Sequence, residues 1–446
     1  MGARGTTATE WNIPTFVRSV IGRLHGSGHQ AYIVGGAVRD LCMGRPATDW
    51  DVATSASPEE ISSVFRTLRS FSLKHETVTL VHKGCHYEVT TFRGPKQTLE
   101  DDLQHRDFTI NAMAYDTGKS VVIDPWEGRK DIEKRVVRGV VSPEDRFRED
   151  PLRLIRAVRF AAELEFRIEG KTLKAISSMT ECITTAAPER IRDEMVKILL
   201  CKTPSQGLHL LKETGLLGCI LPELAEAGRE KRRVVDQTAP DAASRLAALF
   251  CAHAQSHSPD HGKKSCMAAK SIMVRLCFSK SMIRQVGKLV EEEGALGGYD
   301  SSWKDGDLRR FIRRVGAENL RSLVALRKAN LAGFAKGNRE PLRRLNEVQS
   351  RIEGLINTPL VTGSKDLAID GSKVMEITGL SPGPEVGRIL KHLSEELMDH
   401  PEWNTRAKLV AMVKQTKLKT LPEQSEALGK IHGTAGGLKT RAKTKA

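Results

Sequence analysis

The sequence lacks any run of about 18 consecutive apolar residues, the length that an α-helix needs to cross a bilayer. We therefore expect no transmembrane helix and no membrane partner. The first residues contain no apolar stretch of the kind that marks a secretory signal. Cysteine is scarce, with 8 in 446 residues, and no two form a Cys-x-x-Cys pair. Scattered thiols suit a reducing compartment, so the sequence predicts a cytoplasmic protein.

Aromatic residues make up only 5% of the chain, against 39% hydrophobic residues, which favours a helix-rich globular protein of more than one domain. Negative charge is also in deficit, because 55 Asp and Glu face 70 Lys and Arg, for a net charge of +15. Such an excess predicts a polyanionic partner, although a merely basic soluble protein is the alternative. Part of the charge lies in 415–446, a basic arm without periodicity that we expect to be disordered.

A pattern typical of phosphate binding follows an apolar run at 31–34. That run predicts a buried strand, and it ends in Gly35 and Gly36, where backbone without Cβ can approach a ligand closely. The residues that follow, 37–41, predict a short helix. Backbone N–H groups at such a turn can hold phosphate, and Arg39 adds a forked donor.

A second short strand carries Asp49 and Asp51, which at positions i and i+2 share one face. Hard oxygen ligands side by side suit Mg²⁺ carrying a nucleotide triphosphate. Taken singly, Gly-Gly is usually a turn and Asp-x-Asp a solvated loop, but their spacing after a buried strand favours a nucleotidyl-transfer site. A hairpin is predicted at 77–92, around Lys-Gly. On its second strand Glu88 is either a third carboxylate beside the other two or an exposed strand residue.

Two later patterns can bind the rest of a nucleotide. Arg106 can donate to phosphate or ribose hydroxyls, with Asp107 and Asn111 to orient it, although Arg-Asp pairs are also common on surfaces. Residues 147–165 predict one strong helix. Asp150, Arg153 and Ala157 would lie on one stripe of it, with Glu149 and Arg156 beside them. A carboxylate and a guanidinium held together can read a nucleobase edge. The alternative is an i,i+3 salt bridge on a solvated face.

Helical patterns account for much of the remainder. Residues 11–28 predict an amphipathic helix, and Ser57 begins another through a capping box, running to about Leu68. Beyond 187 the chain is predicted to be almost wholly helical. Residues 370–387 predict two helices around a Pro-Gly-Pro turn, whose N–H groups either contact a nucleic-acid backbone or only connect packed helices.

Together these segments resemble the class II tRNA nucleotidyltransferase and bacterial poly(A) polymerase family of the polymerase-β-like superfamily. The four motifs that match in order are GGAVRD…DWD (35–51), HRDFTINAMAYD (105–116), EDPLRLIRAVRF (149–160) and APERIRDE (187–194). PSQGLHLLKETGLLGCILPEL (204–224) resembles the family's neck and body, and DLAIDG…LSPGPEVG…HPEWNT (366–405) resembles the tail of its CCA-type bacterial members.

The resemblance implies an α+β protein, with a polymerase-β-like nucleotidyltransferase head containing a small mixed sheet, followed by an all-α neck, body and tail. We expect tRNA to lie along the helical part. The predicted domains are the head (1–140), the neck with the nucleotide-template helices (141–210), the helical body (211–350), the tRNA-binding tail (351–414) and the basic arm (415–446).

The resemblance also implies roles for residues. Asp49 and Asp51 would bind Mg²⁺ and act in catalysis, with Glu88 as our own candidate for a third catalytic carboxylate. Asp150 and Arg153 would pair with the base of CTP or ATP, and the neck motif 188–194 would hold their helix in place. The nucleotide-binding residues implied are Gly35, Gly36, Arg39, Asp40, Arg106, Asp107, Asn111, Glu149, Asp150, Arg153 and Arg156.

The predicted activity is Mg²⁺-dependent addition of nucleotides of the 3′-terminal CCA to tRNA, without a nucleic-acid template. Two departures from the family matter. His105 stands where Arg is frequent, which affects a minor contact. Only five residues, 94–98, occupy the place of a longer flexible loop that re-aims the template from C to A in enzymes that build the whole CCA end.

The short loop resembles that of CC-adding members, which leave the final A to a separate A-adding enzyme. The first alternative is a full CCA-adding enzyme, in which a neighbouring segment replaces the loop. A poly(A) polymerase is a further alternative, although the tail favours tRNA. A non-catalytic RNA-binding protein would explain the charge but not the clustered carboxylates and arginines.

Overall fold

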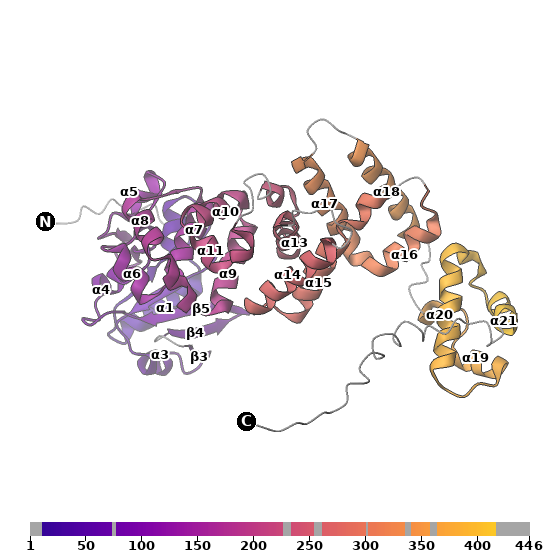
Figure 1. Cartoon of the computed structure of the whole chain (residues 1–446). Helices are drawn as coiled ribbons and strands as arrows, with labels where there is room; N and C mark the ends of the chain where they lie inside the picture. Colours follow the sequence, from indigo (N-terminus) through magenta and orange to yellow (C-terminus); the bar gives the residue numbers. More distant parts are fainter. Residues whose placement is uncertain are drawn as a thin grey trace, which may run out of the picture. The chain divides into compact units, whose positions relative to one another are not determined.

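The computed structural model of the chain describes residues 11–73, 77–225, 233–253, 261–299, 302–334, 340–356 and 364–415 (Figure 1). The chain forms two compact units. The first comprises Met1–Gly298 and Arg321–Leu345, and the second comprises Tyr299–Leu320 and Asn346–Ala446. The predicted division into head, neck, body and tail stays a prediction. The basic arm lies outside the described residues except for Gln415.

Within the described residues of the first unit, seven strands form one mixed sheet in the order β3-β4-β5-β2-β1-β6-β7. All neighbours are antiparallel except β2 and β5, which are parallel. The strands are β1 (Ala31–Val34), β2 (Asp51–Thr54), β3 (Arg69–Leu73), β4 (Thr77–His82), β5 (Cys85–Thr91), β6 (Ala114–Asp116) and β7 (Val121–Ile123).

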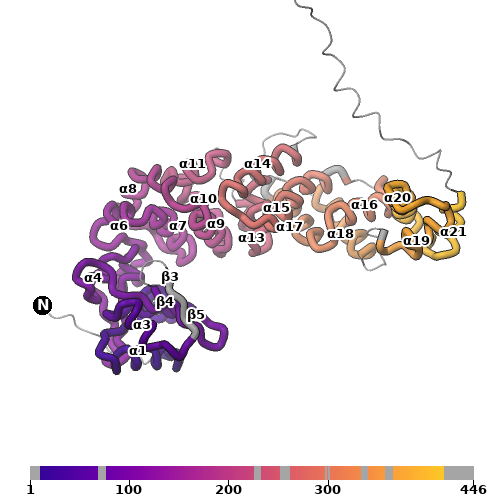
Figure 2. Tube along the Cα trace, turned by 90° about the horizontal axis from the view of Figure 1, so that it is seen from below, coloured from indigo at the N-terminus to yellow at the C-terminus, as the bar shows by residue number. Residues whose placement is uncertain are grey.

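The sheet is covered on both faces, which explains why its strands are apolar on both sides. Helices α1 (Thr15–Gly26) and α3 (Pro58–Val64) pack on one face, in a core that includes Leu24, Ile33 and Phe65. Figure 2 shows α3 beside β4 and β5, and Phe16 of α1 stacks on His82 of β4. On the other face, α4 (Leu99–Gln104) supplies apolar side chains that pack with Phe92. The ends of β2 and β5 thus lie between two packed layers.

Helices make up most of the described chain after the sheet, as predicted. Those of the first unit are α5 (Gly128–Glu133), α6 (Pro143–Glu149), α7 (Leu152–Leu164), α8 (Gly170–Ser178), α9 (Pro188–Leu200), α10 (Pro204–Glu213), α11 (Leu216–Ile220), α13 (Ala242–His253), α14 (His261–Arg275) and α15 (Lys280–Glu292). Short strands β8 (Val136–Val137) and β9 (Arg167–Ile168) pair in parallel beside α7. Helices α17 (Ala317–Phe334) and α18 (Glu340–Ile356) each contribute to both units.

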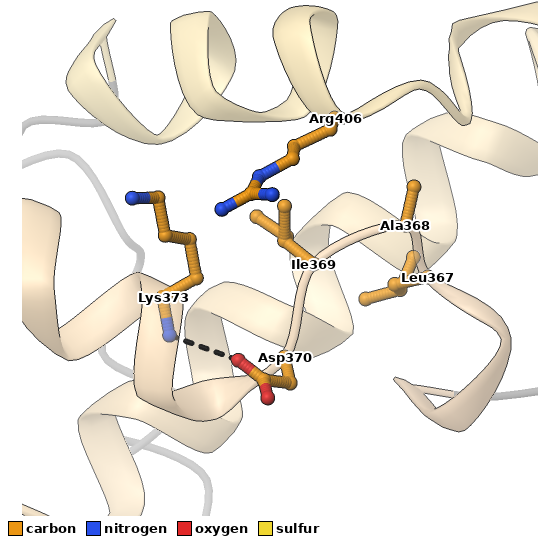
Figure 3. Close-up of a pocket in the computed structure, with 6 residues that line it drawn as sticks. All are labelled: Leu367, Ala368, Ile369, Asp370, Lys373 and Arg406. Atoms are coloured by element: carbon orange, nitrogen blue, oxygen red, sulfur yellow. Dashed lines mark hydrogen bonds between the residues drawn. The ribbon is translucent and has the colours of Figure 1, made fainter.

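The second unit contains α16 (Asp305–Val315), α19 (Gly371–Thr378), α20 (Pro384–Asp399) and α21 (Arg406–Gln415). Ion pairs join α16 to α20, where Arg310 contacts Asp399 and Arg313 contacts Glu395. The helices α19 and α20 on either side of the Pro-Gly-Pro turn confirm that prediction. Between α19 and α21 lies an open pocket of about 350 Å³, lined by the residues of Figure 3: Leu367, Ala368, Ile369, Asp370, Lys373 and Arg406.

The boundaries of several elements differ from the predictions. The helix predicted over 147–165 is two helices, α6 and α7, because Pro151 restricts Asp150 to an extended backbone (φ −146°, ψ 100°). The capping box of Ser57 and Glu60 is present, but α3 ends at Val64, so that the unpredicted strand β3 can follow. Across the described residues, no helix combines the length and the apolar composition needed to span a bilayer.

Candidate active site

The turn between β1 and α2 (Gly36–Cys42) brings the predicted phosphate-binding residues together. Gly35 has φ +73°, a conformation that L side chains rarely adopt, and a Cβ there would lie 3.0 Å from Arg106 Nη1 and 3.6 Å from Asp51 Oδ2. A ligand phosphate at this turn would therefore lie beside both side chains. Arg39 is buried and fixed, because it donates to Asp40 Oδ1 and to Asn111 Oδ1, each at 2.9 Å.

The predicted carboxylates lie on or next to the central strands β2 and β5. Asp51 is the first residue of β2, and its register partner on the parallel strand β5 is Glu88. We expected Glu88 to act as a third carboxylate only if its strand neighbours that of Asp51, and the two strands are neighbours. The catalytic role of Glu88 stays a prediction. Asp49 lies two residues before β2, so the predicted strand that carries both aspartates begins only at Asp51. The two carboxylates are nevertheless close enough to interact.

The charge on Asp51 is poorly compensated. Burial, followed by the negative charges of Asp49 and Glu88, raises the pKa of Asp51 to about 6, while Arg106 and Arg93 offset part of this. Among the described residues, no side chain forms a hydrogen bond or an ion pair with the carboxylates of Asp49 and Asp51. Free carboxylate oxygens in mutual repulsion are the donor set that a divalent cation such as Mg²⁺ prefers.

The residues present therefore fit a metal ion that also takes ligands from the substrate. Within the described part of the chain, no three His, Cys, Asp or Glu side chains are grouped as a complete metal site. Two carboxylates suffice where nucleotide phosphates supply further oxygens, as is common for Mg²⁺. Asp49 and Asp51 are the residues that would hold the ion.

Arg106 is oriented by a different residue from those predicted. Its Nε and Nη2 atoms lie 3.0 and 2.9 Å from Oδ2 of Asp102, a fully buried carboxylate one turn earlier. Asp107 and Asn111, expected to orient Arg106, do not contact it. The pairing is local, because residues i and i+4 of a helix lie on one face.

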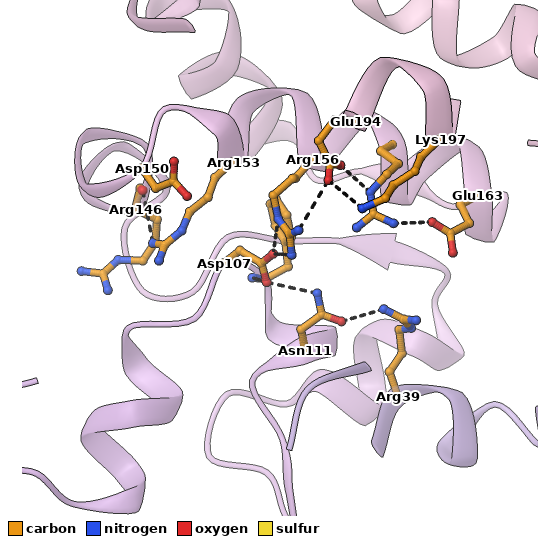
Figure 4. A network of polar contacts seen from close by, with 12 residues as sticks. Arg39, Asp107, Asn111, Arg146, Asp150, Arg153, Arg156, Glu163, Glu194 and Lys197 are labelled. Atoms are coloured by element: carbon orange, nitrogen blue, oxygen red, sulfur yellow. Dashed lines mark hydrogen bonds and ion pairs between the residues drawn. The ribbon is translucent and has the colours of Figure 1, made fainter. Parts of the chain in front are cut away.

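Asp107 and Asn111 instead belong to the buried polar network of Figure 4. Asp107 Oδ2 accepts from Arg156 at 2.6 and 3.0 Å, and Asp107 Oδ1 accepts from Asn111 Nδ2 at 3.0 Å. Burial alone would raise the pKa of Asp107, but Arg156, Asn111 and then Arg153 hold it well below its usual range. Through Asn111 the network continues to Arg39.

On its other side this network reaches the helix α9. Glu194 is buried, and its Oε2 lies 2.6 Å from Arg159 Nε, while its Oε1 lies 3.7 Å from Arg156 Nη1. Arg159 also pairs with Glu163 and stacks over the ring of Phe160 at 3.8 Å. A continuous set of polar contacts thus connects the phosphate-binding turn, the motif at 105–116 and the helices α7 and α9.

The two residues predicted to read the base do not pair with each other. Asp150 receives both guanidinium nitrogens of Arg190, at 2.8 and 3.2 Å, and also accepts from the backbone N–H of Leu152 at 3.2 Å. Arg153 contacts Glu149 Oε2 and the His105 carbonyl, each at 2.9 Å. Both the shared helix stripe and its alternative, an i,i+3 salt bridge, are therefore wrong.

The contact of Arg190 with Asp150 agrees with the expectation that the neck motif holds the template segment. Four residues of the site were not predicted individually: Asp102, Arg159, Arg190 and Glu194. The last three lie inside motifs that the sequence analysis singled out. The only sequence signal for Asp102 was its place four residues before Arg106.

Comparison with known proteins agrees with this architecture. Three family profiles match successive parts of the chain: a Poly A polymerase head domain at residues 31–138, an RNA and SrmB-binding site of polymerase A at residues 165–227, and a tRNA nucleotidyltransferase domain 2 at residues 263–413. A CCA-adding enzyme of Lactobacillus delbrueckii subsp. bulgaricus is 34% identical over 408 residues, which cover 87% of this chain and 94% of the relative.

Solved structures show the same likeness. The structure of a Bacillus stearothermophilus CCA-adding enzyme in complex with CTP matches with a TM-score of 0.71 and 31% identity, covering 89% of this chain and 95% of that one. A Thermotoga maritima CCA-adding enzyme complexed with tRNA matches in fold, with a TM-score of 0.61 and 21% identity over 89% of this chain and 94% of that one.

The fold and the site thus define a nucleotidyltransferase with a polymerase-β-like head and a helical remainder. The chain belongs to the class II tRNA nucleotidyltransferase and poly(A) polymerase family. It is a nucleotidyltransferase that acts at the 3′ end of tRNA, in a family that depends on metal ions.

Proposed function

We propose that this enzyme adds the two cytidines of the CCA end to tRNA with Mg²⁺, and that a separate enzyme adds the A. The short connection from β5 to α4 carries this proposal. Three of its backbone N–H groups are committed: Arg93 donates to Asp102 at 3.2 Å, Lys96 to Asp101 at 2.8 Å, and Gln97 to the Gly94 carbonyl at 3.3 Å. A segment this short, and tied to α4, leaves no chain for a lever.

In the proposed reaction, the tRNA 3′-hydroxyl attacks the α-phosphate of CTP and pyrophosphate leaves. Gly35, Gly36 and Arg39 hold the triphosphate, and Arg106 contacts the ribose. Asp49 and Asp51 would hold Mg²⁺, which lowers the pKa of the attacking hydroxyl and stabilises charge on the phosphate. The fixed side chains hold the reacting groups in line.

Base selection requires the template residues to exchange partners. Asp150 would release Arg190, and Arg153 would release Glu149, before either can hydrogen bond to a base. Each is a partly exposed ion pair, so breaking it costs little. The exchange makes nucleotide selection sensitive to the position of α9 against α7.

Full CCA addition is the second candidate function. The Lactobacillus relative, 34% identical and covered over 94% of its length, is named a CCA-adding enzyme. Solved structures of the family hold CTP, ATP or tRNA. In this case another segment of the chain would have to replace the missing loop.

One experiment separates the two candidates. Purified enzyme is given CTP, ATP and Mg²⁺ with either of two tRNA substrates, one ending before the CCA and one ending in CC, and the product 3′ ends are sequenced. Addition of CC to the first and nothing to the second is the expected result. Completion to CCA on both substrates would reject CC addition. An Asp51→Ala variant, which should add nothing, controls for contaminating activity.

A further inference from the structure

Arg93 lies where β5 passes into the short connection, and no role has so far been given to it. Its backbone N–H donates to Asp102 Oδ1 at 3.2 Å, and its Nε lies 4.0 Å from the same oxygen. The other oxygen of that carboxylate holds Arg106. One buried carboxylate therefore fixes the predicted ribose-binding arginine and Arg93 together.

Charged groups of both signs act on Arg93. Burial, and then the charge of Arg106, lower the pKa of Arg93, with a further contribution from Arg153. Asp102 and Asp107 oppose this lowering, but Asp102 already accepts from Arg106 and Asp107 from Arg156. The donors of Arg153 go to protein acceptors, including Glu149 and the His105 carbonyl. The two neighbouring arginines are thus held by protein acceptors, and the carboxylates nearest to Arg93 already accept hydrogen bonds from other side chains.

The guanidinium N–H groups of Arg93 are available to donate to a ligand. Its side chain is 46% exposed and therefore accessible to a ligand. Among the described residues, no acceptor forms a hydrogen bond with its guanidinium, and its single ion pair is the long contact with Asp102. A partly exposed guanidinium whose donors have no protein acceptor is suited to bind an anion.

Arg93 is also near the reacting groups. Its charge and that of Arg106 both act on the carboxylate of Asp51. Arg106 and Asp51 in turn flank the turn at Gly35, where a Cβ would meet both. The anion nearest to Arg93 during the reaction would therefore be a phosphate of a substrate.

We propose that Arg93 is a substrate-binding residue that contacts a phosphate at this edge of the active site, and that Asp102 positions it. This deepens the proposed function and rests on it, since CTP and tRNA are its substrates. The phosphate belongs either to the triphosphate of the nucleotide or to the 3′-terminal phosphodiester of the tRNA.

The connection explains how Arg93 is held in place. Gly94 has φ +91°, and a Cβ at this position would lie 2.4 Å from Asp101 and 2.8 Å from His105. Only glycine lets the chain lie this closely against α4. The tight turn, together with the bond to Asp102, keeps Arg93 from swinging away from the site.

The test uses Arg93→Gln in the full-length enzyme, with Arg66→Gln as a matched control, because Arg66 is exposed on the same unit and outside this cluster. KM is measured separately for CTP and for a tRNA ending before the CCA. Loss of a charge-assisted contact should raise one KM about tenfold or more in Arg93→Gln alone. A rise for CTP assigns the triphosphate, and a rise for tRNA assigns the phosphodiester. Values of KM and kcat within twofold of the control would overturn the proposal.

Two further variants test positioning. Arg93→Lys keeps the charge and should recover part of the lost affinity. In an Asp102→Asn background, Arg93→Gln should change the same KM by less than about twofold, because coupled residues are not additive. A full tenfold effect in that background would show that Asp102 does not position Arg93.

Equilibrium binding separates this inference from the proposed function. Wild-type enzyme that incorporates no CTP would refute the proposed function. The dissociation constants of CTP and of tRNA, measured by calorimetry without turnover, would still compare Arg93→Gln with its control. Equal constants for both ligands would then refute the role of Arg93 by itself.

Discussion

The carboxylate of Asp51 carries a charge that its surroundings do not favour. Its pKa rises from an ordinary 3.8 to about 6, so the folded state binds a proton more tightly than the unfolded state does. The folded state therefore loses stability as the pH rises from about 4 to 6, and at neutral pH the loss reaches up to about 3 kcal/mol. This is the energetic cost of a site prepared for a cation.

Replacing Asp51 by Asn should separate activity from stability. We expect Asp51→Asn to abolish CTP incorporation and yet to raise the melting temperature of the free enzyme at pH 7, because the buried charge is gone. Scanning calorimetry at pH 7 and at pH 4 checks this, since the gain should disappear at the lower pH. A variant that melts below the wild type at pH 7 would contradict the description of the site.

Asp107 should behave in the opposite way. Its pKa is held below the usual range by Arg156 despite burial, so its contribution to stability is present at neutral pH and lost as the pH falls below about 4. Asp107→Asn leaves Arg156 without its main partner and should cost about 3 kcal/mol at pH 7. Urea denaturation at pH 7 measures this, and an unchanged midpoint would show that the network is not stabilising.

The connection from β5 to α4 is the element on which nucleotide choice depends in our proposal. Replacing residues 94–98 by a longer flexible loop, of the kind expected in enzymes that build the whole CCA end, should allow A to be added to a tRNA that ends in CC. A linker of equal length rich in Gly and Ser is the matched control. If neither graft adds A while both still add C, the short connection is not what limits the wild type.

Helices and strands were predicted best where a few neighbouring residues fix the local backbone. The hairpin of β4 and β5 was predicted almost to the residue, because Lys83 and Gly84 fix the turn and the apolar strands follow directly. The break at Pro151 was missed because the helical spacing of apolar residues continues across it. Local restriction of the residue before proline outweighs that periodicity.

The candidate site could be predicted in its residue types but not in its partnerships. The strand-end glycines and the paired acidic residues form short patterns, so Gly35 and Asp51 were found. The partner of Asp150 lies on a different helix, α9, and nothing in the spacing indicates that Arg190 reaches it. Contacts between distant segments depend on packing, which one sequence does not reveal.

The excess charge of the entire chain bears on tRNA binding. The pocket of Figure 3 is lined by Lys373 and Arg406, whose side chains extend from α19 and α21 toward each other. Lys373 also pairs with Glu376 at 2.7 Å, which leaves Arg406 as the stronger candidate for a phosphate contact. With a net charge of +15, binding of tRNA should weaken steeply with salt.

Arg406→Gln should therefore raise the dissociation constant for tRNA several-fold and reduce its salt dependence, while KM for CTP stays unchanged. Filter binding at several salt concentrations measures both quantities. Arg388→Gln, an exposed arginine of the same unit paired with Glu385, is the control. Equal effects of the two variants would mean that only total charge matters.

The parallel pairing of β2 with β5 also bears on how the enzyme is made. Parallel neighbours require a crossover, and here the crossover includes α3, β3 and β4. Asp51 can face Glu88 only after all of these have been synthesised and folded, and pairings of such high contact order form slowly. A nascent chain that already carries the glycine turn and Asp51 thus has no assembled catalytic centre, and activity should emerge only late in refolding.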